Sequence, residues 1–215
     1  MVAGILIDWG GVLTTSLTDS IARWIAADRI DGPHYREVMR ELIDHAYRGD
    51  NGENIIHALE RGELDGEVFE RDLAARLLTV DGVPPVAEGL LTRMFAEFAR
   101  VDTMYDMLRD VRKNGVKTCL LSNSWSNSYP RHEWDGLFDD IVISGEVGMR
   151  KPEERIFRHA LDRLGLPGEE CVFIDDIEAN IQAAGALGII GIHHRDADTT
   201  ITELESVLGL PLRRA

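Results

Sequence analysis

The feature that most limits the possible folds of this chain is a set of five short apolar runs, separated by longer stretches with helical periodicity. The runs have no polar face and cover residues 3–7, 116–121, 141–143, 171–174 and 189–192. Strands that are apolar on both faces are typical of parallel sheets covered by helices on both sides. The alternation of such runs with amphipathic helices therefore predicts an α/β fold with a Rossmann-like parallel sheet.

The first and second runs are separated by a long segment without a strand pattern. Within residues 14–99, only helical stripes of apolar residues follow one another. We expect Asp65 to cap the third of these helices and Pro84-Pro85 to open the fourth. The predicted domains are an α/β core of residues 1–14 and 100–215 and an inserted all-helical cap of residues 15–99.

Composition limits the partners that this chain can bind. The chain has 215 residues and a formal net charge of −15, which argues against a nucleic-acid partner or an anionic membrane. A small phosphorylated ligand remains compatible, because a site can be locally positive on an acidic protein. Two cysteines without a CxxC motif, no basic N-terminal region and no apolar run near the ~20 residues of a membrane span predict a cytoplasmic protein.

Polar side chains follow four of the apolar runs. In an open parallel sheet, ligands bind beyond the carboxyl ends of the strands, so these side chains are expected to meet at one edge. Taken alone, the polar residues after the first two runs are better explained by turns, the lysine could be a surface residue near a helix start, and the aspartate pair could cap a helix. Their shared position instead indicates a site. The residues are Asp8 after the first run, Ser122 and Asn123 after the second, Lys151 beyond the third, and Asp175 and Asp176 after the fourth.

The stretches around these residues resemble the four motifs of the haloacid dehalogenase-like (HAD) hydrolase superfamily. The matching stretches read ILIDWGGVL, LLSNS, GMRKPEERIF and FIDDIEAN. The resemblance covers nearly the whole chain, since the helical segment lies where this superfamily has its helical cap. The GGVL and GMRKPE stretches are most similar to small sugar-phosphate phosphatases and to the N-terminal phosphatase domain of soluble epoxide hydrolases.

The resemblance implies a hydrolase that cleaves phosphate monoesters of small metabolites with the help of Mg²⁺. Asp8 would be the nucleophile and would form an aspartyl-phosphate that water then cleaves. Mg²⁺, which prefers oxygen ligands, would be held by Asp8, the backbone carbonyl of Gly10, Asp175 and Asp176. The expected partner is a small phosphorylated metabolite, and the expected state is a monomer or a homodimer.

The resemblance also implies which groups hold the phosphate. Ser122 and Lys151 would be catalytic, because a hydroxyl and an ammonium group stabilise charge on the transferring oxygens. The glycine at position 10 lets the backbone approach the phosphate closely. The phosphate-binding residues implied in this way are Trp9, Gly10, Ser122, Asn123 and Lys151.

The chain departs from the superfamily pattern at Gly10, where these phosphatases usually carry a second aspartate that acts as general acid and base. Such help is typically worth ~10²–10⁴-fold in rate. Two alternatives therefore stay open. One is a 2-haloacid dehalogenase, which uses the same aspartate without a metal, although the Asp175-Asp176 pair counts against it. The other is a catalytically weak or non-catalytic protein that binds phosphorylated metabolites.

Three further polar residues have less certain roles. Asn180 lies four residues after Asp176 and fits support of the metal ligands as well as an ordinary position on a helix surface. His193 and His194 end the last apolar run, but no third ligand lies at a zinc-like spacing. A role at the rim of the site or in the core is therefore expected for this pair.

Overall fold

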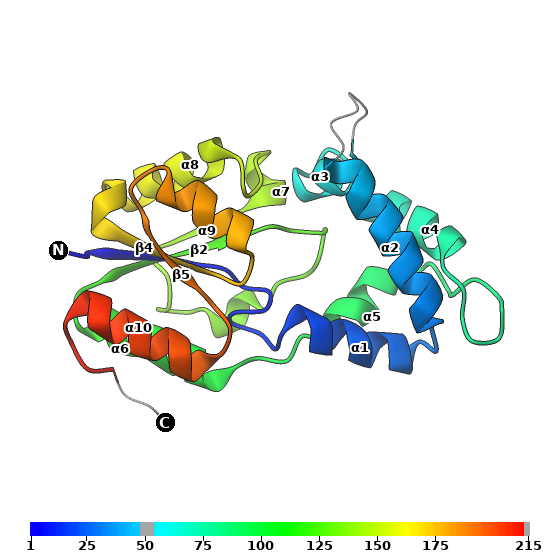
Figure 1. Cartoon of the computed structure of the whole chain (residues 1–215), viewed down its shortest axis with the longest axis horizontal. Coiled ribbons are helices and arrows are strands. Elements are labelled where there is room, and N and C mark those ends of the chain that lie inside the picture. Colours follow the sequence, from blue (N-terminus) through cyan, green and yellow to red (C-terminus); the bar gives the residue numbers. More distant parts are fainter. Residues whose placement is uncertain (48–53, 213–215) are drawn as a thin grey trace.

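The computed structural model describes residues 1–47 and 54–212, except for the side chains of residues 43–47. Its centre is a five-stranded sheet in the order β3-β2-β1-β4-β5, in which all neighbouring strands are parallel (Figure 1). The predicted α/β core is confirmed, because each strand falls on one of the apolar runs. The strands are β1 (Gly4–Ile7), β2 (Lys117–Ser122), β3 (Asp140–Ile143), β4 (Cys171–Asp175) and β5 (Ile190–His193).

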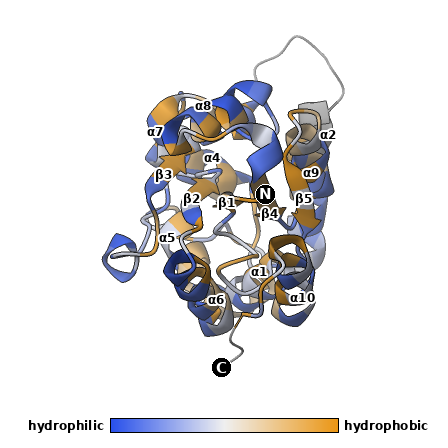
Figure 2. Cartoon of the chain, turned by 90° about the vertical axis from the view of Figure 1, so that its left-hand side faces the viewer, coloured by the Kyte–Doolittle hydropathy of each residue, from blue (hydrophilic) through white to orange (hydrophobic). Residues whose placement is uncertain are grey.

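Helices cover both faces of this sheet (Figure 1). One face carries α6 (Asp102–Lys113) and α10 (Ala197–Leu208), and the other carries α8 (Glu154–Leu164) and α9 (Glu178–Gly185), with the short α7 (Ser144–Val147) after β3. Successive residues of β1 face opposite sides: Leu6 packs in the cluster under α8 and α9, whereas Ile5 and Ile7 pack in the cluster above α6. Figure 2 shows the strands as largely hydrophobic, as expected of a sheet that is buried on both faces.

Five helices lie between β1 and α6 in the described part of the chain, and we call them the helical insertion. Their buried side chains, among them the fully buried Trp24 and Phe69, belong to the same hydrophobic cluster as Ile5 and Ile7 of β1. The helices are α1 (Leu17–Ala27), α2 (Gly32–Tyr47), α3 (Ile55–Glu60), α4 (Gly66–Arg76) and α5 (Leu90–Ala96).

The chain enters and leaves the helical insertion through two paired backbone segments. The N–H of Thr15 donates to the carbonyl of Ala99 at 2.7 Å, and the N–H of Val101 donates to the carbonyl of Leu13 at 3.0 Å. These bonds form an antiparallel bridge next to the end of β1. Both ends of the inserted segment therefore lie together at this double-stranded junction.

Of the helices α4 and α3, only the start of α4 was predicted from the sequence. Asp65 caps α4 as predicted, since its carboxylate accepts the N–H groups of Glu67 and Val68 at 2.9 and 3.2 Å. Helix α3 has no sequence counterpart in our prediction, because it has only 6 residues. Its start is fixed by the side chain of Asn54, which accepts the N–H groups of the first turn.

The prediction that Pro84-Pro85 opens the fourth helix is wrong. Both prolines lie in an irregular connection, and α5 begins only after Gly89. A proline disfavours helical backbone at the residue before it, so Pro85 keeps Pro84 extended. The first N–H groups of α5 are instead satisfied from another helix, because the Glu70 carboxylate accepts those of Gly89 and Leu91 at 3.2 and 2.8 Å.

A second contact joins the helical insertion to the core through Glu60, the last residue of α3. Its carboxylate pairs with the guanidinium of Arg150 and accepts the indole N–H of Trp125 at 3.3 Å. Its backbone carbonyl accepts the hydroxyl of Ser144 at 2.5 Å. The side chains of Glu60 and Arg150 are only 10% and 12% exposed, so this ion pair is largely shielded from solvent.

Both cysteines, Cys119 and Cys171, are buried as free thiols on the side of the sheet that α8 and α9 cover. Burial raises the pKa of the Cys171 thiol to about 11, which keeps it protonated and unreactive at neutral pH. Among the helices of residues 1–47 and 54–212, none combines the length and the apolar character that crossing a bilayer requires.

We expect Glu60 and Arg150 to be strongly coupled in the stability of the protein. A double-mutant cycle with Glu60→Gln and Arg150→Gln, measured by urea unfolding, should give a coupling free energy of about 1–3 kcal/mol, because each single change leaves a shielded charge without its partner. The exposed pair Glu67–Arg71 on α4 is the matched control, with an expected coupling of about 0.5 kcal/mol or less. Equal couplings for the two pairs would contradict this prediction.

Candidate active site

Asp8 lies directly beyond the end of β1 and continues its hydrogen bonding. Its N–H donates to the carbonyl of Ile174 in β4 at 3.0 Å, and the residue is only 7% exposed. The backbone N–H of the next residue, Trp9, donates to the Asp8 carboxylate oxygen Oδ1 at 2.7 Å. The parallel sheet thus fixes both the position and the orientation of this carboxylate.

Lys151 is buried among the acidic residues of the site. Its side chain is 1% exposed, and its ammonium nitrogen lies 2.9 Å from Oδ1 of Asp8 and 2.7 Å from Oδ2 of Asp175. Burial alone would lower the pKa of Lys151, but the Asp175 and Asp8 carboxylates outweigh it and raise this pKa above its usual value. The lysine is therefore a fixed positive charge between two strand ends.

The backbone of Lys151 is held by a side chain from β2. The Asn123 amide accepts the Lys151 N–H at 2.8 Å and donates to the Lys151 carbonyl at 3.0 Å, so one side chain satisfies both backbone groups. This pair of bonds connects the loop after β2 with the segment before α8. Asn123 thereby positions the lysine without contacting its ammonium group.

Asp175 is fully buried at the end of β4 and has several hydrogen-bond donors. Besides Lys151, its carboxylate accepts the N–H of Ile177 at 2.8 Å. The Asn180 amide, also buried, donates to both carboxylate oxygens at 3.0 and 3.1 Å. Of the two roles that the sequence left open for Asn180, the structure shows support of an acidic side chain rather than a place on the helix surface.

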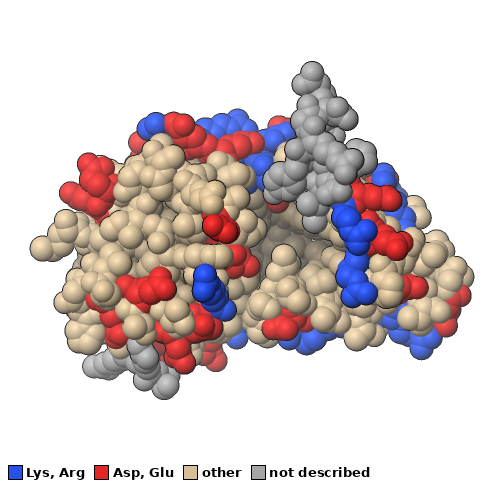
Figure 3. All heavy atoms as spheres, viewed as in Figure 1, with Lys and Arg blue, Asp and Glu red and all other residues tan. Residues whose placement is uncertain are grey.

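The third acidic residue, Asp176, lies against the loop that follows Asp8. A Cβ built on Gly11 would come within 2.4 Å of the Asp176 oxygen Oδ2, and Gly11 has a positive φ of 79°. Asp8, Asp175 and Asp176 each offer an oxygen within 4.8 Å of the others, which suits a hard cation with oxygen ligands. Figure 3 shows the surface hollowed between the core and the helical insertion, with acidic side chains on its core side.

The electrostatics of this cluster favour a bound cation. Burial, together with the charges of Asp175 and Asp176, raises the pKa of Asp8 to about 7, although Lys151 opposes the shift. Burial and the neighbouring Asp175 also raise the pKa of Asp176 to about 6. One ammonium group does not balance three carboxylates, so an additional positive charge would stabilise their ionised forms.

Ser122 ends β2 close to these residues and is 1% exposed. Its hydroxyl lies 3.0 Å from the hydroxyl of Tyr129, which in turn donates to the carbonyl of Asn123 at 3.3 Å. Burial raises the pKa of Tyr129 to about 12, and the nearby charge of Asp8 adds to this shift. Tyr129 is thus a neutral hydroxyl at the site, and sequence analysis did not single it out.

Positions 9 and 10 differ in what their side chains do. The Trp9 ring lies away from the carboxylates, 6.2 Å from the Phe98 ring and 5.0 Å from the Tyr129 ring, so only its backbone N–H contacts Asp8. A Cβ built on Gly10 would meet no atom within 4 Å, and Gly10 is not among the glycines with positive φ. Neither space nor backbone conformation requires a glycine there.

The histidine pair lies at the edge of the site and in the core, as the sequence suggested. The His193 ring contacts the backbone carbonyl of Asp176 at 3.0 Å, while His194 is buried with its ring 2.8 Å from the hydroxyl of Thr200. Neither histidine belongs to the acidic cluster that the described residues form.

Comparison with known proteins agrees with this geometry. The model of the haloacid dehalogenase-like hydrolase family matches residues 2–188, which include Asp8, Lys151 and the Asp175-Asp176 pair. The chain belongs to this hydrolase family. The resemblance inferred from the four motifs is therefore confirmed, and so is its consequence that the protein is an enzyme of the hydrolase class.

Characterised relatives in this family include phosphatases. The sesquiterpene phosphatase astK of Aspergillus oryzae is 30% identical over 70% of this chain and 77% of its own length. The glyceraldehyde 3-phosphate phosphatase of Methanocaldococcus jannaschii is 26% identical over 81% of this chain and 86% of its own length. The bifunctional epoxide hydrolase 2 of Sus scrofa is 34% identical over 50% of this chain, but the match spans only 21% of that longer protein.

Solved structures share the fold. A HAD-like family hydrolase of Porphyromonas gingivalis aligns with a TM-score of 0.69 at 22% identity, over 97% of this chain and 98% of its own. A HAD family enzyme of Bacteroides thetaiotaomicron, solved in complex with magnesium and inorganic phosphate, aligns with a TM-score of 0.60 at 20% identity, over 91% and 95% of the two chains. At these identities, the likeness extends to the fold alone.

We expect Asn123→Ala to destabilise the protein, because it leaves both backbone groups of Lys151 without partners. A loss of about 1–3 kcal/mol in the free energy of unfolding is expected from urea titration. The matched control is Asn114→Ala at the exposed end of α6. It removes the hydrogen bond that the Asn114 side-chain amide donates to the carbonyl of Asp110. Water replaces that bond, so a change within about 0.5 kcal/mol is expected, and equal losses would contradict a special role for Asn123.

Proposed function

We propose that this protein is a Mg²⁺-dependent phosphatase that hydrolyses phosphate monoesters of small metabolites. The observation that supports it best is the buried contact of Lys151 with Asp8 and Asp175, with Asp176 beside them. A carboxylate, an ammonium group and a candidate cation site thus lie together where a phosphate could bind. The names of two relatives, a sesquiterpene phosphatase and a glyceraldehyde 3-phosphate phosphatase, support the same reaction type.

In this proposal Asp8 is the nucleophile and attacks phosphorus through its oxygen Oδ2. The N–H of Trp9 and the ammonium group of Lys151 both contact Oδ1, which fixes the carboxylate and leaves Oδ2 directed elsewhere. The new bond joins Oδ2 to phosphorus as the ester bond breaks, and the leaving oxygen takes up a proton. Water then attacks phosphorus, which releases inorganic phosphate and restores the Asp8 carboxylate.

The phosphate oxygens are held by groups from three segments in this proposal. Lys151 supplies the positive charge, Ser122 a hydroxyl, and Asn123 a backbone N–H, and all three come from the carboxyl edge of the sheet. The backbone of Trp9 and Gly10 completes the phosphate-binding loop. Such groups stabilise charge that spreads over the oxygens in the transition state.

The residues present fit Mg²⁺. Asp8, Asp175 and Asp176 bring three oxygen ligands within 4.8 Å of one another, and the carbonyl of Gly10 is the proposed fourth. Of the described residues, only Lys151 places an ammonium group among these three carboxylates. When bound, Mg²⁺ supplies further positive charge and reduces the repulsion between the Asp8 carboxylate and an anionic phosphate.

We also propose that residues 15–99 act as a cap domain on a core of residues 1–14 and 100–215. The paired junction formed by Thr15 and Ala99 supports this division, because the chain leaves and re-enters the core there. The contact of Glu60 with Arg150 supports a cap that lies against the site, since Arg150 precedes Lys151. A cap of this kind excludes water and contacts the organic part of the substrate.

The remaining alternatives make different demands on the site. A 2-haloacid dehalogenase has no use for a cation, whereas three buried or half-buried carboxylates lie together here. A protein that only binds phosphorylated metabolites would retain Lys151 and Ser122 without turnover, and Gly10 is the observation that motivates it. The named relatives span both an apolar and a small polar phosphate ester, so they leave the organic group of the substrate open.

Asp8→Asn should abolish phosphate release. With 4-nitrophenyl phosphate and Mg²⁺, we expect a rate below about one-thousandth of that of the unaltered protein, because the amide is not a nucleophile. Asp106→Asn, at an exposed position on α6, is the control and should keep its rate. Turnover that survives in Asp8→Asn would remove Asp8 from the mechanism, and phosphate binding without any turnover in the unaltered protein would favour the binding-only alternative.

Gly10→Asp should accelerate esters with poor leaving groups. The position has open space and an ordinary backbone conformation, so an added carboxyl group can act as the missing general acid. The expected gain in the rate of glycerol 3-phosphate hydrolysis is up to about 10²–10⁴-fold. The gain on 4-nitrophenyl phosphate should be smaller, because its leaving group needs less protonation. Gly11→Asp is the matched control and should slow both reactions, since its side chain would collide with Asp176. An unchanged rate of Gly10→Asp on glycerol 3-phosphate would contradict this assignment.

A further inference from the structure

A cavity of about 390 Å³ lies beside the candidate active site, between the core and the helical insertion. Its aromatic walls come from both parts of the molecule: Trp9, Tyr105 and Tyr129 from the core, and Phe95 and Phe98 from the segment at the end of α5. Because liquid water occupies about 30 Å³ per molecule, the cavity has room for a group of about a dozen heavy atoms. The rest of its lining is mostly polar and includes Thr14, Ser128 and Glu133. Pockets of this size that combine aromatic and polar groups are typical of sites for small organic groups.

Two of the aromatic walls contact the proposed catalytic groups directly. Trp9 follows Asp8, and its N–H donates to the Asp8 carboxylate at 2.7 Å. The Tyr129 hydroxyl lies 3.0 Å from the hydroxyl of Ser122. The two rings meet edge to face with their centres 5.0 Å apart. The cavity is thus lined by two residues that also contact the proposed phosphate site.

Among the described residues that line the cavity, Arg100 is the one lysine or arginine, and its charge is already paired. The guanidinium of Arg100 lies 4.1 Å from the centre of the Tyr105 ring and pairs with Glu133 at 3.1 Å and Asp102 at 2.8 Å. A phosphate is thus better placed at Lys151, and a neutral group is better placed in the cavity.

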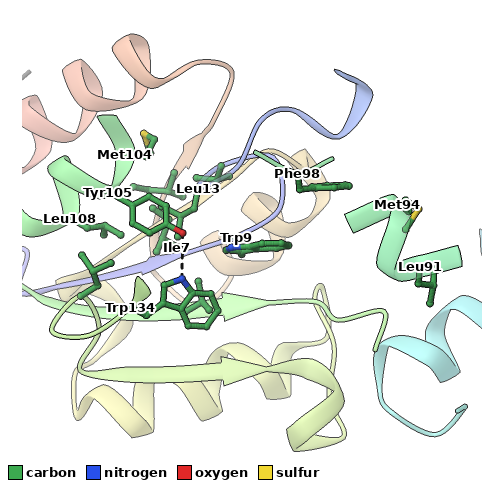
Figure 4. Packing of buried hydrophobic residues seen from close by; sticks show 14 of the residues in the cluster. Ile7, Trp9, Leu13, Leu91, Met94, Phe98, Met104, Tyr105, Leu108 and Trp134 are labelled. Carbon is green, nitrogen blue, oxygen red and sulfur yellow. Dashed lines mark hydrogen bonds between the residues drawn. The ribbon is translucent and has the colours of Figure 1, made fainter. Parts of the chain in front are cut away.

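One polar atom of the cavity wall lacks a partner. The indole nitrogen Nε1 of Trp9 is buried without a hydrogen bond to any described residue. Figure 4 shows it on the side of Tyr105, whose hydroxyl already accepts the indole N–H of Trp134 at 3.3 Å. A buried N–H without an acceptor costs about 1–3 kcal/mol, so an occupant with an oxygen or a π face near this atom would bind better than a plain alkane.

A second cavity, of about 370 Å³, is less suited to bind a neutral organic group. It is lined by polar groups that include Ser124, Asn127 and the carboxylates of Asp65 and Glu146. It borders the proposed phosphate site through Tyr129 but is not lined by Trp9.

From this geometry we propose that the aromatic cavity binds the organic group of the substrate, and that the preferred substrates are phosphate monoesters of bulky apolar alcohols or phenols. This inference rests on the proposed phosphatase function. The phosphate would lie at Asp8, Ser122 and Lys151, while the apolar group would pack in the cavity against Trp9 and Phe98. Because Phe98 ends the helical insertion and Trp9 follows β1, the substrate itself would bridge the two parts of the molecule.

The test compares three activated phosphates whose leaving groups differ in size. 1-Naphthyl and phenyl phosphate have leaving groups of similar acidity, and acetyl phosphate is too small to fill the cavity. We expect kcat/KM to be at least about tenfold higher for the naphthyl than for the phenyl ester, because an apolar pocket favours the larger apolar group. Ser128→Trp places a large side chain at an exposed position of the cavity wall and should abolish this preference. Its kcat/KM for acetyl phosphate should stay within about twofold of that of the unaltered protein.

The matched control is Glu146→Trp, which adds the same ring to the wall of the polar cavity and should keep the naphthyl preference. Binding of 1-naphthol, measured by calorimetry, provides a readout without catalysis and should be lost in Ser128→Trp alone. Hydrolysis of all three phosphates without a size preference, or a preference lost in Glu146→Trp instead, would overturn the cavity assignment and leave the phosphatase proposal standing. Hydrolysis of none of them would overturn the phosphatase proposal, whatever 1-naphthol binding shows.

Discussion

The buried ammonium group of Lys151 is the interaction on which the rest of the site depends. Removing a charge from water is costly, and this side chain is 1% exposed. The cost is offset only because Asp8 and Asp175, from neighbouring strands, both lie within hydrogen-bond distance. The lysine therefore joins β1, β4 and the segment before α8, and the carboxylates cannot move apart without leaving it unpaired.

Other parts of the structure serve to hold this charged group in place. Asn123 holds the backbone of the lysine from β2, and Asn180 holds Asp175 from α9. Within residues 1–47 and 54–212, the arrangement still leaves three carboxylates with a single ammonium group among them. A protein with a net charge of −15 can thus offer an anionic substrate a favourable place only through a localised ammonium group and a cation.

The fold and the acidic cluster were predictable because they follow from rules of parallel sheets. Apolar runs without a polar face identified the strands, and polar residues at their carboxyl ends had to meet at one edge. Contacts of residues that lie outside any local sequence pattern were not predictable. Tyr129 lies in a loop without periodicity, Glu60 ends a helix too short to be recognised, and the start of α5 depends on a glutamate from α4. In each case the contacting residue comes from a segment that only the tertiary structure brings close, so no local sequence pattern reveals the contact.

The junction between Thr15 and Ala99 has a consequence for how such an enzyme can diversify. Because the two ends of the helical insertion are hydrogen-bonded to each other, the distance that the inserted segment must span is the same whatever its length or fold. One segment can then be exchanged for another during evolution without changing the register of the sheet. The carboxylates and the lysine stay where the strands place them, while the wall that Phe95 and Phe98 contribute is inherited with the exchanged segment. The chemistry of the reaction and the choice of substrate can thus evolve separately.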